Sequence, residues 1–431
     1  MKKITALLMA LLMMLSMSAA MAESNPYAVT EPITIEWWHS NEDQYTEDIK
    51  KLEAMFEAEY PMIDVVPMYI GSGATLAEQL IAAHAADSVP AVSQCNVGYL
   101  AEYASSGVTT NLEPYFEAYG INKDDFVKGY RASATLAEDG NMYSFPFLAS
   151  TQVIYYNKTI AQAEGITMPT TWEEMDAFME KATVKNADGT TARYAMVFGG
   201  WGSQYFETFF TNYGVEVIKE DGTSGVADEV SIEIVTKIKE WIDKGYAYYA
   251  YGTGASSNMR QLFWDGGAFS VFHTSSLYDT YVTNVGDSFE VGMAWLPGGN
   301  DGETFKSEVG GAAILIPAAA SQAEKNAAWQ FLMFMTSPEI NLYWADKTGY
   351  FPTRASVQGT PEYEEYLSRK PAMADIVAMA GWINPRNQNP AYDACANLGR
   401  TAMYEIFNNN APIQETLDQL AVEIQETLDD Q

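Results

Sequence analysis

Carboxylates are the most numerous chemically active side chains of this sequence, with 57 Asp and Glu against 24 Lys and Arg. Two carboxylates about 5–9.5 Å apart can hydrolyse a glycosidic bond, so glycoside hydrolysis is the first candidate reaction. No pair falls in a strand-end pattern typical of it. Glu173 and Glu174 stand in the first turn of an expected helix, where acids complement the helix dipole, and Asp265 stands in a turn. A secreted glycoside hydrolase therefore stays a less favoured alternative.

The sequence also lacks the short motifs of other common chemistries. It contains no Gly-x-Ser-x-Gly, Gly-x-x-x-x-Gly-Lys or His-Glu-x-x-His stretch. His39, His84 and His273 are scattered without the spacing of metal ligands, and Cys95 and Cys395 stand 300 residues apart. We therefore expect no enzyme, no metal and no cofactor. A single disulfide between the two cysteines stays open, because an exported chain meets oxidising conditions.

The first 22 residues have the pattern of a secretory signal peptide. Lys2 and Lys3 precede an apolar run over residues 4–17, and the small residues of 20–22 predict cleavage before Glu23. The run is shorter than the roughly 20 apolar residues that span a bilayer. No cysteine lies near the cleavage site, so we expect a periplasmic protein without a lipid anchor.

Net charge limits the partners of the exported chain. Loss of Lys2 and Lys3 takes the formal charge from −33 to −35. So acidic a chain is not expected to bind nucleic acid or an anionic membrane surface, and its charge favours a soluble monomer. Aromatic residues make up 13% of the chain; many must be core, but aromatic faces also serve as platforms for sugars.

The segment after the signal peptide alternates strands and helices. Strands are expected over residues 33–38, 63–69 and 89–95, and helices over 44–60 and 75–86, where apolar residues recur at helical spacing. This order predicts an α/β lobe with a mainly parallel sheet.

About 409 residues remain after cleavage, more than the ~100–200 of an ordinary domain. No Pro/Gly/Ser-rich linker divides them, so we expect two lobes with mixed sheets, joined by crossing strands that act as a hinge around a ligand cleft. Lobe one is predicted over residues 27–148 and 273–351, and lobe two over 149–272 and 352–431.

Short stretches in a fixed order carry a family resemblance. They are Trp37-Trp38-His39-Ser40, Phe145-Pro146-Phe147 with Ser150-Thr151, Tyr155-Tyr156-Asn157-Lys158, Pro169-Thr170-Thr171-Trp172-Glu173-Glu174, and Gly310-Gly311 with Thr348-Gly349-Tyr350-Phe351-Pro352-Thr353. From about residue 31 onwards, the chain resembles the extracellular solute-binding proteins of ABC importers for sugars and sugar phosphates. Within that family it is most similar to the component that binds glycerol-3-phosphate and glycerophosphodiesters. The resemblance implies the type II periplasmic binding protein fold, a small-molecule solute and a membrane permease as partner.

The resemblance also implies a set of ligand-binding residues. Matched motif by motif, the phosphate would be held by Ser150, Thr274, Ser275, Gly310, Gly311, Tyr350 and Arg400. Tyr69 and Asn96 would lie at the glycerol end, and Trp172 would pack on the ligand. Asn96 stands where the family has an acidic residue, and an amide both donates and accepts hydrogen bonds. The residues expected at the phosphate half of the site therefore match the family more closely than those expected at the alcohol half.

The proposed phosphate site makes chemical sense, and each residue also has a structural alternative. An arginine fork suits a phosphate, and glycine lets a backbone N–H approach it closely. Arg400 could instead form a surface ion pair of little energy. Gly310 and Gly311 could serve tight strand packing, and Trp172 could belong to the core of lobe two. Arg386, in a loop, is the second candidate cation.

These observations predict capture of glycerol-3-phosphate or a glycerophosphodiester and its delivery to a permease, without chemistry. The alternative within the same class is a neutral sugar or oligosaccharide, gripped by aromatic residues such as Tyr69, Trp172 and Trp201.

Overall fold

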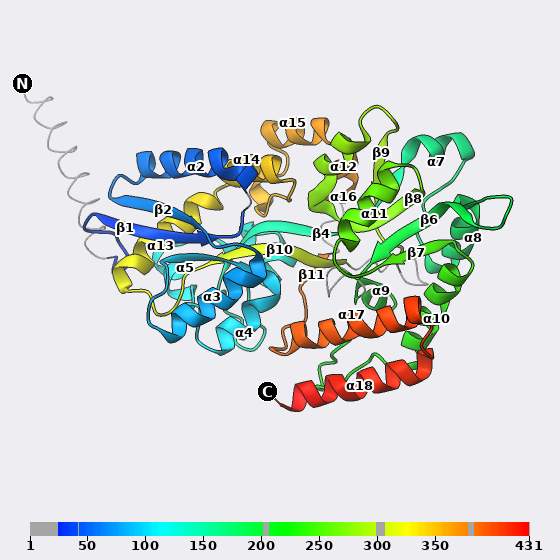
Figure 1. Cartoon of the computed structure of the whole chain (residues 1–431). Coiled ribbons are helices and arrows are strands. Elements are labelled where there is room, and N and C mark those ends of the chain that lie inside the picture. The colour runs from blue at the N-terminus through cyan, green and yellow to red at the C-terminus, as the bar shows by residue number, and fades with distance from the viewer. Residues whose placement is uncertain (1–24, 42, 201–206, 299–306, 378–382, 431) are drawn as a thin grey trace, which may run out of the picture.

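The computed structural model describes residues 25–41, 43–200, 207–298, 307–377 and 383–430. The predicted signal peptide and Trp201 lie outside these ranges. The described elements form two halves joined in the middle by long strands (Figure 1). The sheet strands follow the order β2-β1-β3-β10-β4-β8-β6-β5, with β7, β9 and β11 attached at its side.

The first half begins with the predicted βαβαβ unit. Strands β1 (Ile33–His39), β2 (Ile63–Tyr69) and β3 (Val92–Asn96) are parallel and alternate with α2 (Thr46–Glu59) and α3 (Gly73–Ala85). Because the strands are parallel, their carboxyl ends meet at one edge of the sheet, where polar side chains can face a ligand.

Further helices cover the sheet of the first half. In chain order they are α4 (Leu100–Ser105), α5 (Glu113–Tyr119), α6 (Lys128–Ser133), α13 (Gln322–Met335) and α14 (Pro338–Thr348), with short 3-10 turns η1 (Asp43–Tyr45), η2 (Val97–Tyr99), η3 (Lys123–Asp125) and η6 (Ala355–Val357). Helix α13 begins with a capping box, in which the side chains of Ser321 and Glu324 each accept a hydrogen bond from the other's backbone N–H. It packs on β1 and contributes the buried Trp329 to the core.

The second half is built around its own strands and helices. Its strands are β5 (Val184–Lys185), β6 (Thr191–Gly199), β7 (Ala247–Ala250), β8 (Ala268–Thr274) and β9 (Val291–Ala294). Its helices are α7 (Lys158–Glu164), α8 (Trp172–Ala182), α9 (Glu207–Asn212), α10 (Glu229–Asp243), α11 (Ala255–Trp264), α12 (Tyr278–Val285), α17 (Tyr392–Asn409) and α18 (Ile413–Asp429), with the turn η5 (Ser275–Leu277). Helices α15 (Pro361–Arg369) and α16 (Pro371–Val377) follow the first half in sequence, and α16 packs on β9.

Two strands cross between the halves. Residues 145–151 of β4 (Phe145–Asn157) pair with β10 (Ser307–Leu315), whereas residues 152–157 pair with β8 and β9. Strand β10 likewise pairs with β3 near its end and with β11 (Ile383–Asn384) at its start. The mixed α/β fold with two halves joined by crossing strands is therefore confirmed, and the pairing partner of each crossing strand changes between the halves.

The contacts of one segment differ from the predicted lobe boundary at residue 273. Strand β9 pairs with residues 154–157 of β4, and α12 packs on α11. The segment 275–294 therefore packs with the second half, and the chain returns to the first half along β10. The reason is local: the polar stretch after β8 forms a turn into another helix of the same half rather than a crossing. The other lobe limits stay predictions.

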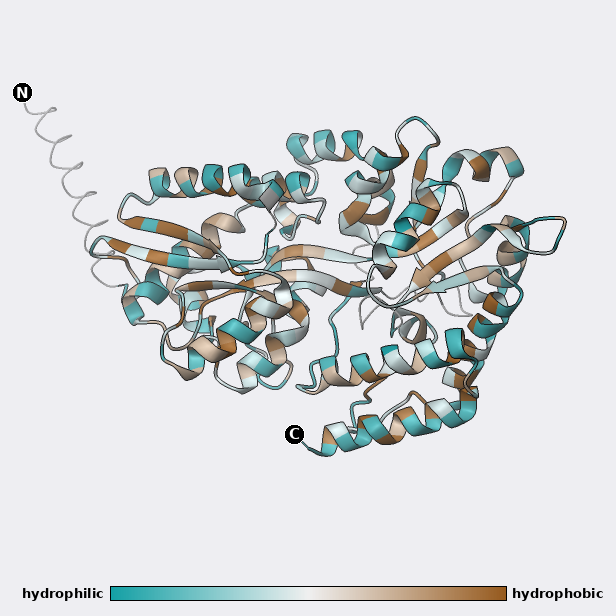
Figure 2. Cartoon of the chain, viewed as in Figure 1, coloured by the Kyte–Doolittle hydropathy of each residue, from teal (hydrophilic) through white to brown (hydrophobic). Residues whose placement is uncertain are grey.

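Each half has its own apolar core. One core gathers Trp37, Phe56 and Trp329 around β1, and the other gathers Trp172, Trp241 and Phe272 around β6 and β8. Figure 2 shows the corresponding hydrophobic residues along the strands and on the helix faces turned towards them. Within the described ranges, no helix is both long and apolar enough to cross a membrane.

Gly311 in β10 provides a test of the crossing geometry. Its φ is +100°, and a Cβ added there would lie 1.8 Å from the carbonyl oxygen of Leu148. We expect Gly311→Ala to lower the free energy of unfolding by about 3 kcal/mol or more, from backbone strain and overpacking together. Urea unfolding measures this. Gly189→Ala is the control, since its φ is +86° but its Cβ would meet open space; equal losses in both variants would contradict the account.

Candidate functional site

Several of the predicted phosphate residues come together where the strands cross. Ser150 of β4 lies opposite Gly310 of β10, and a Cβ on Gly310 would be 2.7 Å from the Ser150 hydroxyl. The backbone N–H of Thr151 donates to the hydroxyl of Ser275 at 3.1 Å. Thr274, the last residue of β8, pairs with Gln152 of β4. Hydroxyl groups from the middle of β4 and from the end of β8 with the turn after it thus lie together at the crossing.

Tyr350 approaches the same crossing from the end of α14. A Cβ on Gly311 would lie 3.1 Å from the Tyr350 ring, and Phe351 bridges to Ala149 of β4. Both glycines therefore permit close packing of a side chain on the strand. This packing accounts for glycine at the two positions whether or not a ligand is bound.

Arg386 reaches the crossing from the loop that follows β11. Its Nε donates to the carbonyl oxygen of Val309 at 3.0 Å, and its Nη1 donates to Oδ1 of Asn96 at 3.3 Å. The side chain is 6% exposed. Within the described residues, its Nη2 makes no hydrogen bond. The second candidate cation, and not the first, is thus held beside Gly310 and joined to Asn96.

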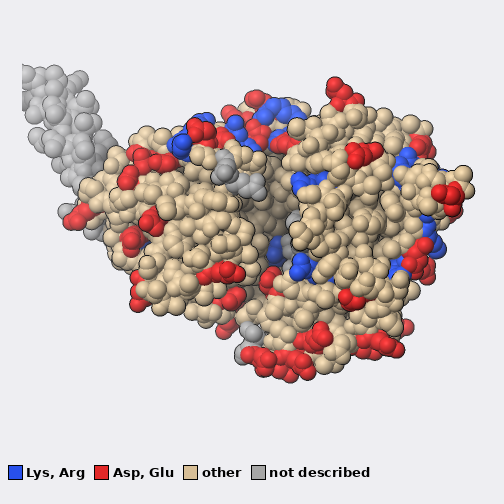
Figure 3. All heavy atoms as spheres, in the orientation of Figure 1, with Lys and Arg blue, Asp and Glu red and all other residues tan. Residues whose placement is uncertain are grey.

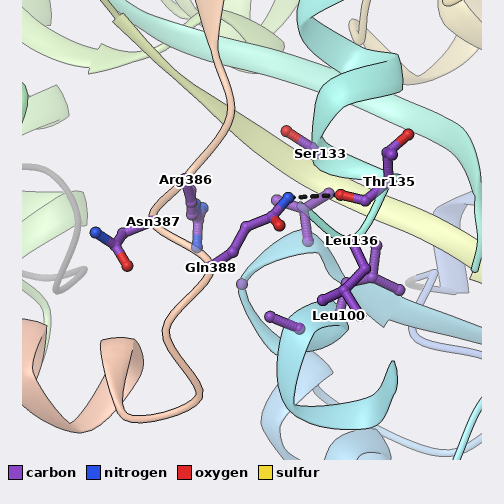
Figure 4. A pocket seen from close by; sticks show the side chains of 10 residues that line it. Leu100, Ser133, Thr135, Leu136, Arg386, Asn387 and Gln388 are labelled. Atoms are coloured by element: carbon purple, nitrogen blue, oxygen red, sulfur yellow. Dashed lines mark hydrogen bonds between the residues drawn. The ribbon is translucent and has the colours of Figure 1, made fainter. Parts of the chain in front are cut away.

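The loop of Arg386 connects both halves. Nε2 of Gln388 donates to the carbonyl oxygen of Thr135 at 2.6 Å, in the first half, and Nδ2 of Asn387 donates to that of Ile218 at 2.9 Å, in the second. Figure 4 shows Arg386 and Gln388 reaching from this loop, with Ser133 and Thr135 on the facing segment. Figure 3 shows a hollow between the two halves with basic atoms on its wall.

Arg400 lies elsewhere, on α17 inside the second half. It lines a pocket with Glu207, Cys395 and Met403, and its guanidinium carbon is 6.0 Å from the Tyr251 ring centre. Its Nε is buried without a hydrogen-bond partner among the described residues. No described hydrogen bond joins it to the crossing strands. Cys395 and Cys95 are both buried and free.

The two predicted aromatic contacts occupy different environments. Trp172 is fully buried and stacks on Trp241 with ring centres 5.9 Å apart. This places it in the core, the alternative that its sequence position left open. Tyr69 is 53% exposed at the end of β2, 6.1 Å from the His39 ring. Tyr69 and Asn96 therefore lie at the shared carboxyl edge of the parallel strands.

A buried acidic cluster lies next to the crossing, and the sequence had not indicated it. Glu308 of β10 and Glu207 of α9 are both nearly inaccessible to solvent. The Tyr392 hydroxyl donates to Oε2 of Glu207 at 2.5 Å and lies 3.5 Å from Oε2 of Glu308. The signal that could have found it is Glu308 itself, an acid two residues before Gly310 in an otherwise uncharged strand.

Burial determines the protonation of this cluster. It raises the pKa of Glu207 to about 7, against the opposing effects of the Tyr392 hydrogen bond and the Arg386 charge. Burial and then the charge of Glu207 raise the pKa of Glu308 well above its usual range. The pKa of Tyr392 is raised too, first by burial, so its hydroxyl stays a donor at neutral pH. The cluster thus holds at least one carboxyl proton near pH 7.

Comparison with known proteins agrees with this geometry. The family model for bacterial extracellular solute-binding proteins matches residues 38–341. The chain belongs to this family. It is the solute-binding component of an ABC importer of the sugar type, and it is a binding protein rather than an enzyme.

The similar proteins are named for two kinds of solute. The chain is 26% identical over 356 residues to the sn-glycerol-3-phosphate-binding periplasmic protein UgpB of Pectobacterium atrosepticum, covering 79% of this chain and 78% of the relative. It is similar to the structure of UgpB from Mycobacterium tuberculosis in complex with glycerophosphocholine, with TM-score 0.79, 23% identity and coverage of 93% and 99%. It is equally similar to the sugar-binding protein MalE of Xanthomonas citri, with TM-score 0.80, 20% identity and coverage of 92% and 98%.

Substitution of Trp172 separates core packing from ligand contact. We expect Trp172→Ala to lower the free energy of unfolding by about 3–5 kcal/mol, as for other large core residues. Trp172→Phe should lose less stability and keep the solute affinity of the wild type. Chemical unfolding and calorimetry measure the two quantities, with Trp329→Phe in the other core as control. A Trp172→Phe protein of normal stability that binds solute poorly would contradict the core assignment.

The pKa of Glu207 predicts a pH dependence of stability. The folded carboxyl keeps its proton up to a pKa of about 7, whereas the unfolded one releases it near its ordinary 4.5. The folded state thus binds more protons between these values, and its stability falls as pH rises through this window. Glu207→Gln cannot titrate, so its unfolding free energy should fall less between pH 5 and pH 8. Parallel pH profiles of wild type and variant would refute the prediction.

Proposed function

We propose that this protein captures glycerol-3-phosphate or a glycerophosphodiester between its two halves and delivers it to a membrane permease. The observation that carries the proposal is Arg386. Its guanidinium is buried beside Gly310, bonded to the backbone of Val309 and to Asn96, with Nη2 free of hydrogen bonds within the described residues.

An anion needs such a local site in this chain. The formal charge of −33 opposes the approach of any anion, so binding must come from fixed donors at short range. Arg386 supplies the charge, and the hydroxyl groups of Ser150, Ser275 and Tyr350 supply neutral donors close to the crossing strands. Hydrogen bonds to a charged group contribute about 1.5–3 kcal/mol each. We therefore assign the role of cation to Arg386 in place of Arg400.

The fold suits capture by closure. A solute at the crossing strands touches both halves only when they approach each other, so its binding energy favours the closed form. The loop of Arg386, bonded to both halves, would move with that closure. We propose export by the signal peptide over residues 1–22, action as a periplasmic monomer without a lipid anchor, and docking of the closed form on the permease.

A neutral sugar is the second candidate. Two observations favour it: the buried carboxyl groups of Glu207 and Glu308, which can accept hydrogen bonds from hydroxyl groups, and the exposed aromatic ring of Tyr69 at the sheet edge. The similar structures include a sugar-binding protein, which also supports the neutral-sugar candidate.

Titration calorimetry on the refolded mature chain separates the candidates. The solutes are glycerol-3-phosphate, glycerophosphocholine and maltose, and the variants are Arg386→Gln with Arg400→Gln as its matched control. We expect both phosphates to bind the wild type. Arg386→Gln should weaken them at least about tenfold, the loss of one charged hydrogen bond, while Arg400→Gln should change affinity little.

Other outcomes reassign the site or the solute. Loss of affinity in Arg400→Gln alone would return the role of cation to α17. Binding heat on titration with maltose, and none with glycerol-3-phosphate or glycerophosphocholine, would refute the phosphate proposal and support the neutral sugar.

A further inference from the structure

We propose that the carboxyl pair, Glu207 with Glu308, binds a proton when an anionic solute is captured beside Arg386, so that solute and proton are taken up together. The proposal rests on the proposed function, because it needs an anion at Arg386. It adds a second ligand, the proton, and names the residues that hold it.

The geometry of the carboxyl pair requires a shared proton. Both groups are buried and contact the same Tyr392 hydroxyl, which donates to Glu207 and leaves Glu308 at 3.5 Å. One hydroxyl hydrogen cannot satisfy two carboxylates at once. Two negative charges this close in a buried site are unfavourable, so one group stays protonated over part of the neutral range.

Arg386 links the pair to the solute site. Its charge is close enough to lower the pKa of both carboxyl groups, while its Nε and Nη1 hold Val309 and Asn96 at the crossing. A phosphate bound to its remaining donor would offset the positive charge that now favours ionised carboxylates. It would also add negative charge of its own. Both effects raise the proton affinity of the pair, and the proton comes from solvent.

Other groups around the pair do not remove this coupling. The titratable and charged groups that face it from the packed elements are Tyr392, Cys395 and Arg400 on α17 and Arg386 after β11. Burial raises the pKa of Tyr392, and that of Cys395 to about 11, so both stay neutral near pH 7. The carboxyl pair is therefore the group in this surrounding that can change its proton content.

Linkage makes the effect reciprocal. If the solute raises the proton affinity of the pair, a proton on the pair must raise the affinity for the solute by the same factor. Binding should therefore be tighter at lower pH, and the solute should leave more readily when the pair loses its proton. A neutral sugar, which leaves the charge of Arg386 in place, should show neither effect.

Calorimetry with glycerophosphocholine tests the proposal directly. A phosphodiester does not titrate near neutral pH, so any proton exchanged belongs to the protein. Titration at pH 7.5 in buffers of different ionisation enthalpy gives the number of protons bound with each solute. We expect an uptake of about half a proton per solute, and an affinity at least about threefold weaker at pH 8.5 than at pH 6.5.

Variants assign the proton to the carboxyl pair. The double variant Glu207→Gln/Glu308→Gln should abolish the uptake, each single variant should reduce it, and Glu173→Gln, which removes an exposed acid on α8, should leave it unchanged. If a variant of the carboxyl pair fails to fold, the proton uptake of the wild-type protein still tests the proposal. Binding of glycerophosphocholine with no proton uptake would overturn this inference and leave the proposed function intact. No binding of glycerophosphocholine at all would instead overturn the proposed function.

Discussion

Hydrogen bonding of the crossing strands is the constraint from which the rest of the structure follows. Every backbone group of β4 needs a partner, and β4 is too long to find all of them in one half. It pairs with β10 over residues 145–151 and with β8 and β9 over 152–157. The change of partner ties the halves together at one point. Ser150, Gly310 and the Arg386 loop all meet there.

Electrostatics at that point follows from burial. Arg386 and the two carboxyl groups are removed from water, so each depends on the others for stabilisation. Burial raises the pKa of both acids, and the one guanidinium and one phenol that they share lower it only in part. A site of this kind responds to added charge more strongly than an exposed one would, because little solvent is present to screen it.

The sequence predicted the fold better than the site. Alternation of strands and helices was enough to identify the βαβαβ unit, because apolar periodicity reports burial directly. The absence of a linker predicted the crossing, and the motifs around Ser150 and Gly310, which carried the family resemblance, lie in the crossing strands themselves. Arg400 and Arg386 could not be ranked, since the position of a loop depends on contacts distant in sequence, such as that of Gln388 with Thr135. Trp172 had two equal interpretations until its neighbour Trp241 was known.

A crystal structure of the refolded protein with glycerophosphocholine tests the central claim most directly. We expect the phosphate oxygens within hydrogen-bond distance of the Arg386 guanidinium, between the two halves and beside Ser150 and Gly310. A phosphate bound at Arg400 inside the second half, or a solute held without any contact to Arg386, would contradict the account.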